Sequence, residues 1–186
     1  FDTTDIRCKL RIALYPRKQQ QELLEELNFN DKAQVSLARL CIKNKNIERA
    51  SFLCKQARSK GNANAWFLCG QMLEKGMIQD EYSAAEMYIK AGECGMISAF
   101  TRAAELVDIS ERDEIFDMEC TFGSPYGHVN KGTLYLHQGE REKAINEYIL
   151  AGVVGISILL QINENTLAEE AIKQHNKSLA KLRSML

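Results

Sequence analysis

The fold of this chain is decided by residues 128–152, which read HVNKGTLYLHQGEREKAINEYILAG. No catalytic motif stands out in this stretch, yet small and large residues recur in it at regular places. We expect a first helix over residues 126–138 and a second over residues 140–151. Gly139 supplies the turn between them, because glycine readily ends a helix, and Glu140 opens the second helix with a charge that suits the helix dipole.

Small residues lie on the faces that these two helices are expected to turn toward each other. Residues three or four apart share one face of a helix. A spacing of 12, 4 and 3 residues runs through Gly132, Ala144, Tyr148 and Ala151. Small side chains let two helix backbones approach closely, and the tyrosines, Tyr135 on the first helix and Tyr148 on the second, fill the wider gaps beside them. The stretch therefore predicts a helical hairpin.

The same spacing occurs twice upstream. The first copy has the same offsets of 12, 4 and 3 and runs through Ala38, Ala50, Cys54 and Ala57. The second copy has a turn two residues longer, so its first offset is 14, and it runs through Gly70, Ala84, Tyr88 and Ala91. Ala57 and Ala91 are 34 residues apart. A period of 34 residues made of two helices is the tetratricopeptide signature.

The chain resembles a series of tetratricopeptide repeats, with at least one unit closer to the Sel1-like variety. Trp66 stands four residues before Gly70, as the tryptophan of this family does, and Leu73 follows in the family's aromatic position. The segment Gly76–Asp80 resembles the longer Sel1-like turn. The resemblance is good in three units, at about residues 32–61, 63–95 and 126–155.

A degenerate unit is expected between the second and third matched units. Its first helix, residues 98–109, keeps Phe100 in the tryptophan position and Ala104 in the glycine position. Its second helix, residues 110–123, carries charges where small residues belong. Divergence on a partly exposed helix and adaptation to a basic partner both explain these charges.

The resemblance implies an all-α fold, a right-handed α-solenoid of about 11 helices stacked in antiparallel pairs. We expect a single domain over residues 1–186, with a helix pair in 1–30, four repeat units in 31–155 and capping helices in 156–186. The apolar stripe expected on the last helix is Leu167, Ala171, Ile172, Leu179 and Leu182. Because the sequence starts with phenylalanine, we expect it to be part of a longer or processed protein.

In this family the first helix of each pair lines a concave groove, which implies a set of candidate binding residues. They are Val35, Arg39, Ile42, Lys43, Phe67, Gln71, Glu74, Lys75, Thr101, Glu105, Asp108, Val129, Thr133, Leu136 and His137. This mixture of apolar and polar side chains suits an extended or helical peptide. For each residue the alternative is that it only covers a neighbouring repeat. The lysine and asparagine pair that clamps chaperone tails in related domains is missing, because Val35 and Arg39 stand in its place.

An enzyme is not expected. The sequence holds no phosphate-binding loop, nucleophile elbow, zinc-protease motif or dinucleotide fingerprint. The carboxylates of residues 111–119 have no histidine, lysine or glycine-rich loop beside them, so they are interpreted as a solvated helix face. No cofactor is therefore predicted.

The cysteines are interpreted as core residues. The six are Cys8, Cys41, Cys54, Cys69, Cys94 and Cys120. They contain no C-x-x-C pair, and the three histidines lie far from them in the sequence, so no metal site is predicted. We expect free, buried thiols in a reducing compartment, although the even number would permit three disulfides in an exported protein.

Charge is distributed unevenly along the chain. Residues 1–60 carry 13 basic and 7 acidic side chains, residues 61–120 carry 4 and 12, and the remainder carries 7 and 6. Three interpretations stay open: head-to-tail self-association, an acidic partner for the basic end, and an uneven solvated surface. The basic third lacks interleaved aromatic residues, so direct nucleic-acid binding is not expected.

The predicted function is protein–protein interaction. We expect the groove to bind a peptide or helix of a partner, as an adaptor or scaffold in a bacterial assembly, secretion or envelope system. The alternative is the sensing or oligomerisation region of a larger protein, such as a transcriptional regulator. No apolar run reaches the roughly 18 residues of a membrane span. A cytoplasmic location is favoured, and a periplasmic one applies if a signal peptide has been removed.

Overall fold

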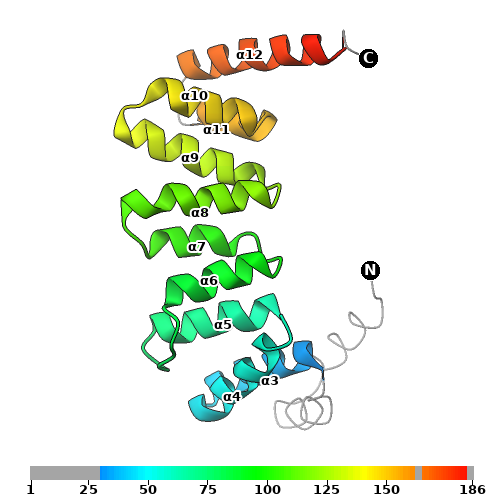
Figure 1. Cartoon of the computed structure of the whole chain (residues 1–186), viewed down its shortest axis with the longest axis vertical. Helices are drawn as coiled ribbons and strands as arrows, with labels where there is room; N and C mark the ends of the chain where they lie inside the picture. Colours follow the sequence, from blue (N-terminus) through cyan, green and yellow to red (C-terminus); the bar gives the residue numbers. More distant parts are fainter. Residues whose placement is uncertain (1–29, 162–164, 184–186) are drawn as a thin grey trace. The chain divides into compact units, whose positions relative to one another are not determined.

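The computed structural model describes residues 30–161 and 165–183, and all the secondary structure in these two ranges is helical (Figure 1). The helix pair predicted for residues 1–30 falls almost entirely outside the described residues. The described helices group into two compact units, the first ending at Met96 and the second beginning at Ile97. The prediction of one domain over the whole chain stays a prediction.

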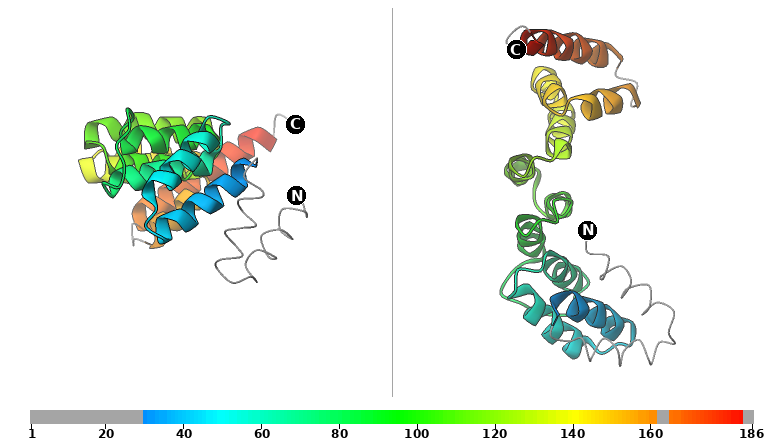
Figure 2. Two further views of the ribbon diagram at one scale, coloured as in Figure 1. Left: turned by 90° about the horizontal axis from the view of Figure 1, so that it is seen from below. Right: turned by 90° about the vertical axis from the view of Figure 1, so that its right-hand side faces the viewer.

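The first unit contains two sequential helix pairs. Their bounds are α3 (Asp31–Lys43), α4 (Ile47–Arg58), α5 (Ala63–Glu74) and α6 (Ala84–Glu93). Figure 2 shows α3 and α4 side by side in both views, in blue and cyan. One core of buried residues joins the two pairs, and it includes Leu37, Leu53, Leu68, Met72 and Met87.

An asparagine or serine caps the start of each helix in the first unit. Asn30, Asn46 and Asn62 each accept a hydrogen bond from a backbone N–H in the first turn of the helix that follows. Ser83 and Glu86 form a capping box at the start of α6. These caps satisfy backbone donors that the helix itself leaves unpaired, so the helix starts are fixed by the sequence.

A glycine on the first helix packs against a tyrosine on the second in two of the repeats. A Cβ atom added to Gly70 would lie 2.8 Å from the Tyr88 ring, and one added to Gly132 would lie 3.0 Å from the Tyr148 ring. Both tyrosines are fully buried. The predicted role of small residues in close helix packing is therefore confirmed, but the ring lies directly on the glycine rather than in a gap beside it.

The second unit contains six helices in three sequential pairs. Their bounds are α7 (Ala99–Glu105), α8 (Ile109–Thr121), α9 (Pro125–Gln138), α10 (Arg141–Leu150), α11 (Val153–Gln161) and α12 (Asn165–Arg183). The hairpin predicted from residues 128–152 is confirmed as α9 and α10. Gly139 ends α9 in the left-handed conformation, with φ of 81°.

The degenerate unit is confirmed as a helix pair, but its first helix is shorter than predicted. α7 ends at Glu105, because Leu106 to Asp108 leave the helical path and Asp108 takes an extended conformation before α8. Phe100 and Ala104 are both buried, in agreement with the repeat positions assigned to them. One of the charges on α8, Glu119, is also buried.

The capping stripe on α12 is only partly correct. Leu167 and Ala171 are buried, whereas Ile172 and Leu179 are exposed to 37% and 41%. The side chain of Leu182 lies outside the described part. The helix is rotated so that its small and first-turn apolar residues meet α10 and α11, which leaves the second half of the stripe uncovered within the described residues.

The cysteines divide into two groups. Cys41, Cys54 and Cys69 are buried in the core of the first unit and form no disulfide among the described residues, as predicted. Cys94 follows α6 and is exposed, so the prediction of a buried thiol is wrong there. It lies in the turn beyond the last helical residue, where the backbone turns away from the core. Cys8 lies outside the described residues.

Candidate functional site

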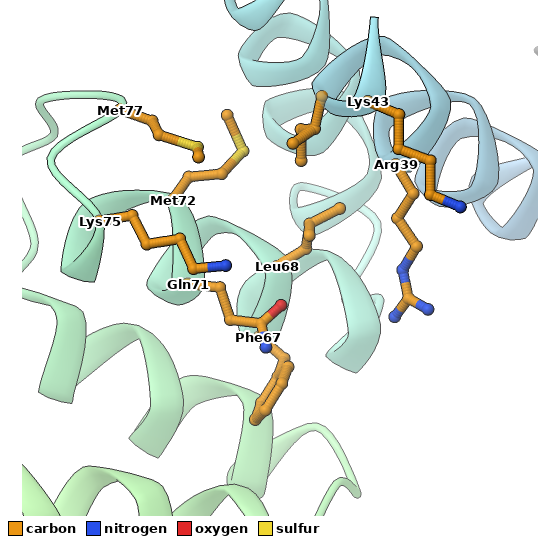
Figure 3. Close-up of a pocket in the computed structure, with 9 residues that line it drawn as sticks. Arg39, Lys43, Phe67, Leu68, Gln71, Met72, Lys75 and Met77 are labelled. Carbon is orange, nitrogen blue, oxygen red and sulfur yellow. The ribbon is translucent and has the colours of Figure 1, made fainter. Parts of the chain in front are cut away.

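A cavity of about 430 Å³ lies between the first helices of the two repeats in the first unit (Figure 3). Its lining comes from α3, from α5 and from the start of the long turn after α5. The lining residues are Arg39, Ile42, Lys43, Phe67, Leu68, Gln71, Met72, Lys75 and Met77. Six of these were predicted as groove residues from the sequence. The structure therefore brings together most of the candidates that the first unit contributes.

The apolar part of this cavity is held in place by the core beneath it. Leu68 and Met72 are buried, and Ile42 packs against the same core. The Phe67 ring contacts the Tyr88 ring at a centroid distance of 5.0 Å, which ties α5 to α6. These contacts make the apolar surface of the cavity a preformed feature of the repeat pair rather than a loose set of side chains.

Three cations surround the apolar part. Arg39 and Lys43 come from α3, and Lys75 caps the end of α5 (Figure 3). All three side chains are exposed, and none forms an ion pair with a carboxylate in the described ranges 30–161 and 165–183. The lining contains no acidic residue. The cavity therefore presents positive charge around an apolar centre.

The remaining two candidates of the first unit lie beside this cavity. Val35 is only 5% exposed and lines a neighbouring polar cavity of about 420 Å³, which Arg39 also borders. Glu74 accepts a hydrogen bond of 2.7 Å from the Tyr88 hydroxyl, so it supports the helix pair. Because Val35 packs into the core, it can offer a partner little surface.

A polar and aromatic cluster, which sequence analysis missed, fixes the long turn after α5. Arg58 pairs with Asp80 at 3.1 Å, and its guanidinium lies over the Trp66 ring at 5.1 Å and the Tyr82 ring at 5.8 Å. The Asp80 side chain is 3% exposed. Burial raises the pKa of this carboxyl, but the hydrogen bond and charge of Arg58 outweigh it and hold the pKa below its usual value. Asp80, the charged residue at the end of the Sel1-like turn, was the sequence feature that could have revealed this cluster.

The candidates of the second unit have mainly structural roles, which the structure shows residue by residue. Thr133 bonds the Val129 carbonyl and contacts the Tyr148 hydroxyl at 3.0 Å. Val129 is 6% exposed, and Leu136 packs against the same core. These three residues stabilise α9 against α10, and of the three only Val129 is buried.

The other second-unit candidates lie apart from these three. Thr101 bonds the buried Glu119 carboxylate at 3.5 Å. Glu105 pairs with Arg102 on the surface of α7. Asp108 and His137 are exposed at a helix start and a helix end, respectively. These four residues take part in different local contacts, whereas the first unit brings six of its candidates to one cavity.

Two polar clusters join the helices of the second unit. Glu119 accepts hydrogen bonds from Ser124 at 3.1 Å and Asn130 at 3.1 Å, and burial raises the pKa of its carboxyl against the lowering effect of these bonds. Lys131 reaches Asp117 at 2.5 Å and Glu147 at 3.7 Å. Each cluster is satisfied internally, so both stabilise helix packing.

Across residues 30–161 and 165–183, no group of three or more His, Cys, Asp or Glu side chains is arranged to hold a metal ion. No helix in these ranges has the length and apolar character needed to cross a bilayer.

No protein-family profile matches the sequence, and neither does any curated protein. Among solved structures, the chain is similar to a Sel1 repeat protein from Oxalobacter formigenes, with a TM-score of 0.58 and 17% identity, over 88% of this chain and 80% of that one. It is also similar to a protective antigen of uropathogenic Escherichia coli that displays an SLR fold, with a TM-score of 0.51 and 20% identity, over 77% of this chain and 36% of that one. At such identities the likeness establishes the fold. The chain is all-α, its described helices stack in sequential pairs, and it has the Sel1-like repeat fold.

Proposed function

We propose that this chain is an adaptor or scaffold that binds a segment of a partner protein at the cavity between α3 and α5. Sel1-like repeats generally mediate protein–protein interactions, and the fold is typically non-catalytic. Stacked helix pairs offer extended surfaces formed by corresponding helices of successive repeats. The proposed setting is a bacterial assembly, secretion or envelope system, with the chain itself in the cytoplasm.

The observation that carries the proposal is the composition of this cavity. Ligand sites are concave, largely apolar and edged by a few polar groups that fix orientation. The cavity has such an apolar centre in Ile42, Phe67 and Met77, and the amide of Gln71 adds a donor and an acceptor. A peptide needs both kinds of contact, because its side chains require apolar pockets and its backbone requires hydrogen-bond partners.

A second candidate function is oligomerisation within a larger protein. The uneven charge supports it, since residues 1–60 carry an excess of six positive charges, from 13 basic and 7 acidic residues, and residues 61–120 an excess of eight negative charges, from 4 and 12. Two copies could attract each other through these regions. The cavity favours a separate partner, because its apolar centre requires a complementary apolar group and not charge alone.

The test is a selection of peptides from a random display library on three versions of the chain. The first is the parent. The second carries Phe67→Ala and Gln71→Ala in the cavity, and the matched control carries Phe52→Ala and Gln79→Ala, which are exposed in the same unit outside the cavity lining. Circular dichroism melting establishes that all three fold.

Peptides enriched on the parent are expected to bind the cavity variant at least ~10-fold more weakly, a loss of about 1.4 kcal/mol. Their affinity for the control is expected to match the parent. Enrichment that survives the cavity changes, or the absence of any enriched peptide, would show that this cavity is not the binding site.

A further inference from the structure

We infer that the segment bound at this cavity is acidic, with a bulky apolar side chain between its carboxylates; this inference rests on the proposed function. The cavity is bordered by three cations, Arg39, Lys43 and Lys75. Their charges have no counterpart in the described residues, so an incoming carboxylate would supply one.

Three other cations of the first unit have such counterparts. Arg58 and Lys55 pair with Asp80 at 3.1 and 3.7 Å, and Lys90 pairs with Glu93 at 2.8 Å. The cations at the cavity differ from these, although Glu74 lies next to Lys75 in the sequence. The Glu74 carboxylate instead accepts the Tyr88 hydroxyl at 2.7 Å. Three cations without a carboxylate partner in the described residues therefore border one cavity.

Helix dipoles explain only part of this arrangement. Lys43 is in the last turn of α3, and Lys75 follows the last residue of α5, where positive side chains are favoured by the dipole. Arg39 lies one turn earlier on α3 and gains less from this effect. The dipole also does not account for a lining that contains three cations and no carboxylate.

The net charge of the whole chain does not explain binding of an acidic segment. The formal charge is −1 at pH 7, and positive charge is in excess only in residues 1–60 and, by one, in residues 121–186. Attraction must come from charges within about 10 Å of the ligand, the screening length at ordinary ionic strength. Exposed ion pairs contribute less than about 1 kcal/mol each, so charge alone would give weak binding.

The apolar centre of the cavity provides the attraction that charge alone does not. Met77 is 39% exposed although it borders the cavity, and Phe67 and Ile42 are only half-buried. Methionine side chains are flexible and adapt to ligands of different shape. In Figure 3 Met77 and Met72 lie on one side of the cavity, with Arg39 on the other. A leucine or phenylalanine entering the cavity would cover this surface while flanking carboxylates meet the three cations.

The experiment measures fluorescence anisotropy with short synthetic peptides that differ in one property at a time. The main peptide has a Leu-Phe centre flanked by Asp and Glu, with both ends blocked. The comparisons replace the centre with Ser-Ser, replace the acidic residues with Lys and Arg, or leave the carboxyl end free. The last peptide distinguishes acidic side chains from a terminal carboxylate as the recognised group.

Two charge-reversed variants locate the binding. Lys43→Glu with Lys75→Glu changes the cavity, and Arg49→Glu with Lys60→Glu makes the same change of charge at exposed sites of the first unit outside the cavity lining. We expect the blocked acidic Leu-Phe peptide to bind the parent, to bind the cavity variant at least ~10-fold more weakly, and to bind the control like the parent. The Ser-Ser peptide and the basic peptide are expected to bind at least ~10-fold more weakly than the main peptide.

Several outcomes would overturn the inference. Preferential binding of the basic peptide, lost in the variant with Phe67→Ala and Gln71→Ala, would overturn the acidic assignment but leave the proposed function intact. Binding that needs the free carboxyl end would assign the cavity to a terminal carboxylate. Failure of every peptide would overturn the inference, and the library selection would then decide the function separately. Self-association in sedimentation velocity that disappears in the cavity variant would assign the surface to a second copy.

Discussion

A glycine facing a tyrosine sets the distance between the two helices of a repeat. Gly70 lies under Tyr88, and the first repeat uses Ala38 and Cys54 at the matching positions, both fully buried. In the first repeat, therefore, alanine replaces glycine on the first helix, and the smaller cysteine replaces tyrosine on the second helix. The sum of the two volumes, rather than either residue alone, fits the space between the helices.

Gly70→Ala is expected to destabilise the first unit by about 1–3 kcal/mol, because the new Cβ would crowd the Tyr88 ring and overpacking costs more than the better helix propensity of alanine returns. Tyr88→Cys is expected to destabilise it by leaving a cavity.

Urea unfolding of the single and double variants measures the coupling between residues 70 and 88. We expect the double variant to be more stable than the sum of the single effects predicts by about 1 kcal/mol, as in the first repeat. Strict additivity would show that the pair is not coupled.

Glu119 is expected to make the second unit less stable as pH rises. Burial raises the pKa of its carboxyl in the folded state above the ordinary value of about 4.3, so folding favours the protonated form. Its contribution is present below the unfolded pKa and is lost as pH rises through the folded pKa. Glu119→Gln should remove this dependence, with its amide oxygen accepting the Asn130 hydrogen bond and its NH2 group donating to the Ser124 hydroxyl.

The measurement is thermal unfolding of the parent and the Glu119→Gln variant at pH values from below the unfolded pKa of Glu119 to above its folded pKa. The melting temperature of the variant relative to the parent is expected to rise with pH. The control is Glu111→Gln on the exposed start of α8. An equal response of both variants would mean that the burial of Glu119 does not shift its titration.

At the scale of elements, Lys131 connects three helices of the second unit. From α9 it reaches Asp113 and Asp117 on α8 and Glu147 on α10, and its side chain is 11% exposed. His128 adds a contact of 2.8 Å to Glu147. A lysine in this position joins helices that carry acidic groups on facing sides, which explains how the charges of α8 are accommodated.

Lys131→Ala is expected to lower the free energy of unfolding by about 2 kcal/mol. Breaking a buried ion pair costs about 3–5 kcal/mol, and the partial exposure of Asp117 reduces this value. Chemical denaturation compares the variant with Lys173→Ala, a lysine exposed on α12. Equal effects of the two substitutions would show that Lys131 does not link the helices.

Much of this element structure could be predicted from the sequence, because repeats state the same local rules several times. The glycine turn at Gly139 and the small residues of the helix pairs follow from spacing alone. The Arg58 to Asp80 pair and its stacking on Trp66 could not be predicted, since they join residues that are 22 and 8 positions apart through the packing of three elements. The burial of Val35 could not be predicted either, because periodicity gives the helix face on which a residue lies but not how closely its neighbours cover it.

At the scale of the whole molecule, each repeat is expected to depend on its neighbours for stability. Helix pairs of this size cannot bury their faces alone, so stability comes from shared cores. In the first unit the same core contains Cys41 of α3, Cys54 of α4 and Cys69 of α5. The reactivity of these thiols therefore shows whether the two helix pairs unfold together.

Mass-spectrometric labelling with a thiol reagent in increasing urea tests this cooperativity. Cys94 is expected to react without denaturant, because it is exposed. Cys41, Cys54 and Cys69 should become reactive together, at the denaturant concentration that unfolds the first unit. Labelling of Cys41 well before Cys69 would show instead that the first pair opens independently.

We propose that this Sel1-like fold binds a partner segment at the surface of α3 and α5 in the first unit. Hydrogen–deuterium exchange of the chain, with and without a saturating peptide from the library selection, tests it most directly. We expect slower exchange on binding in residues 39–43 and 67–77, with no comparable change in α8. Protection confined to α8, or the same small protection in every helix, would contradict it.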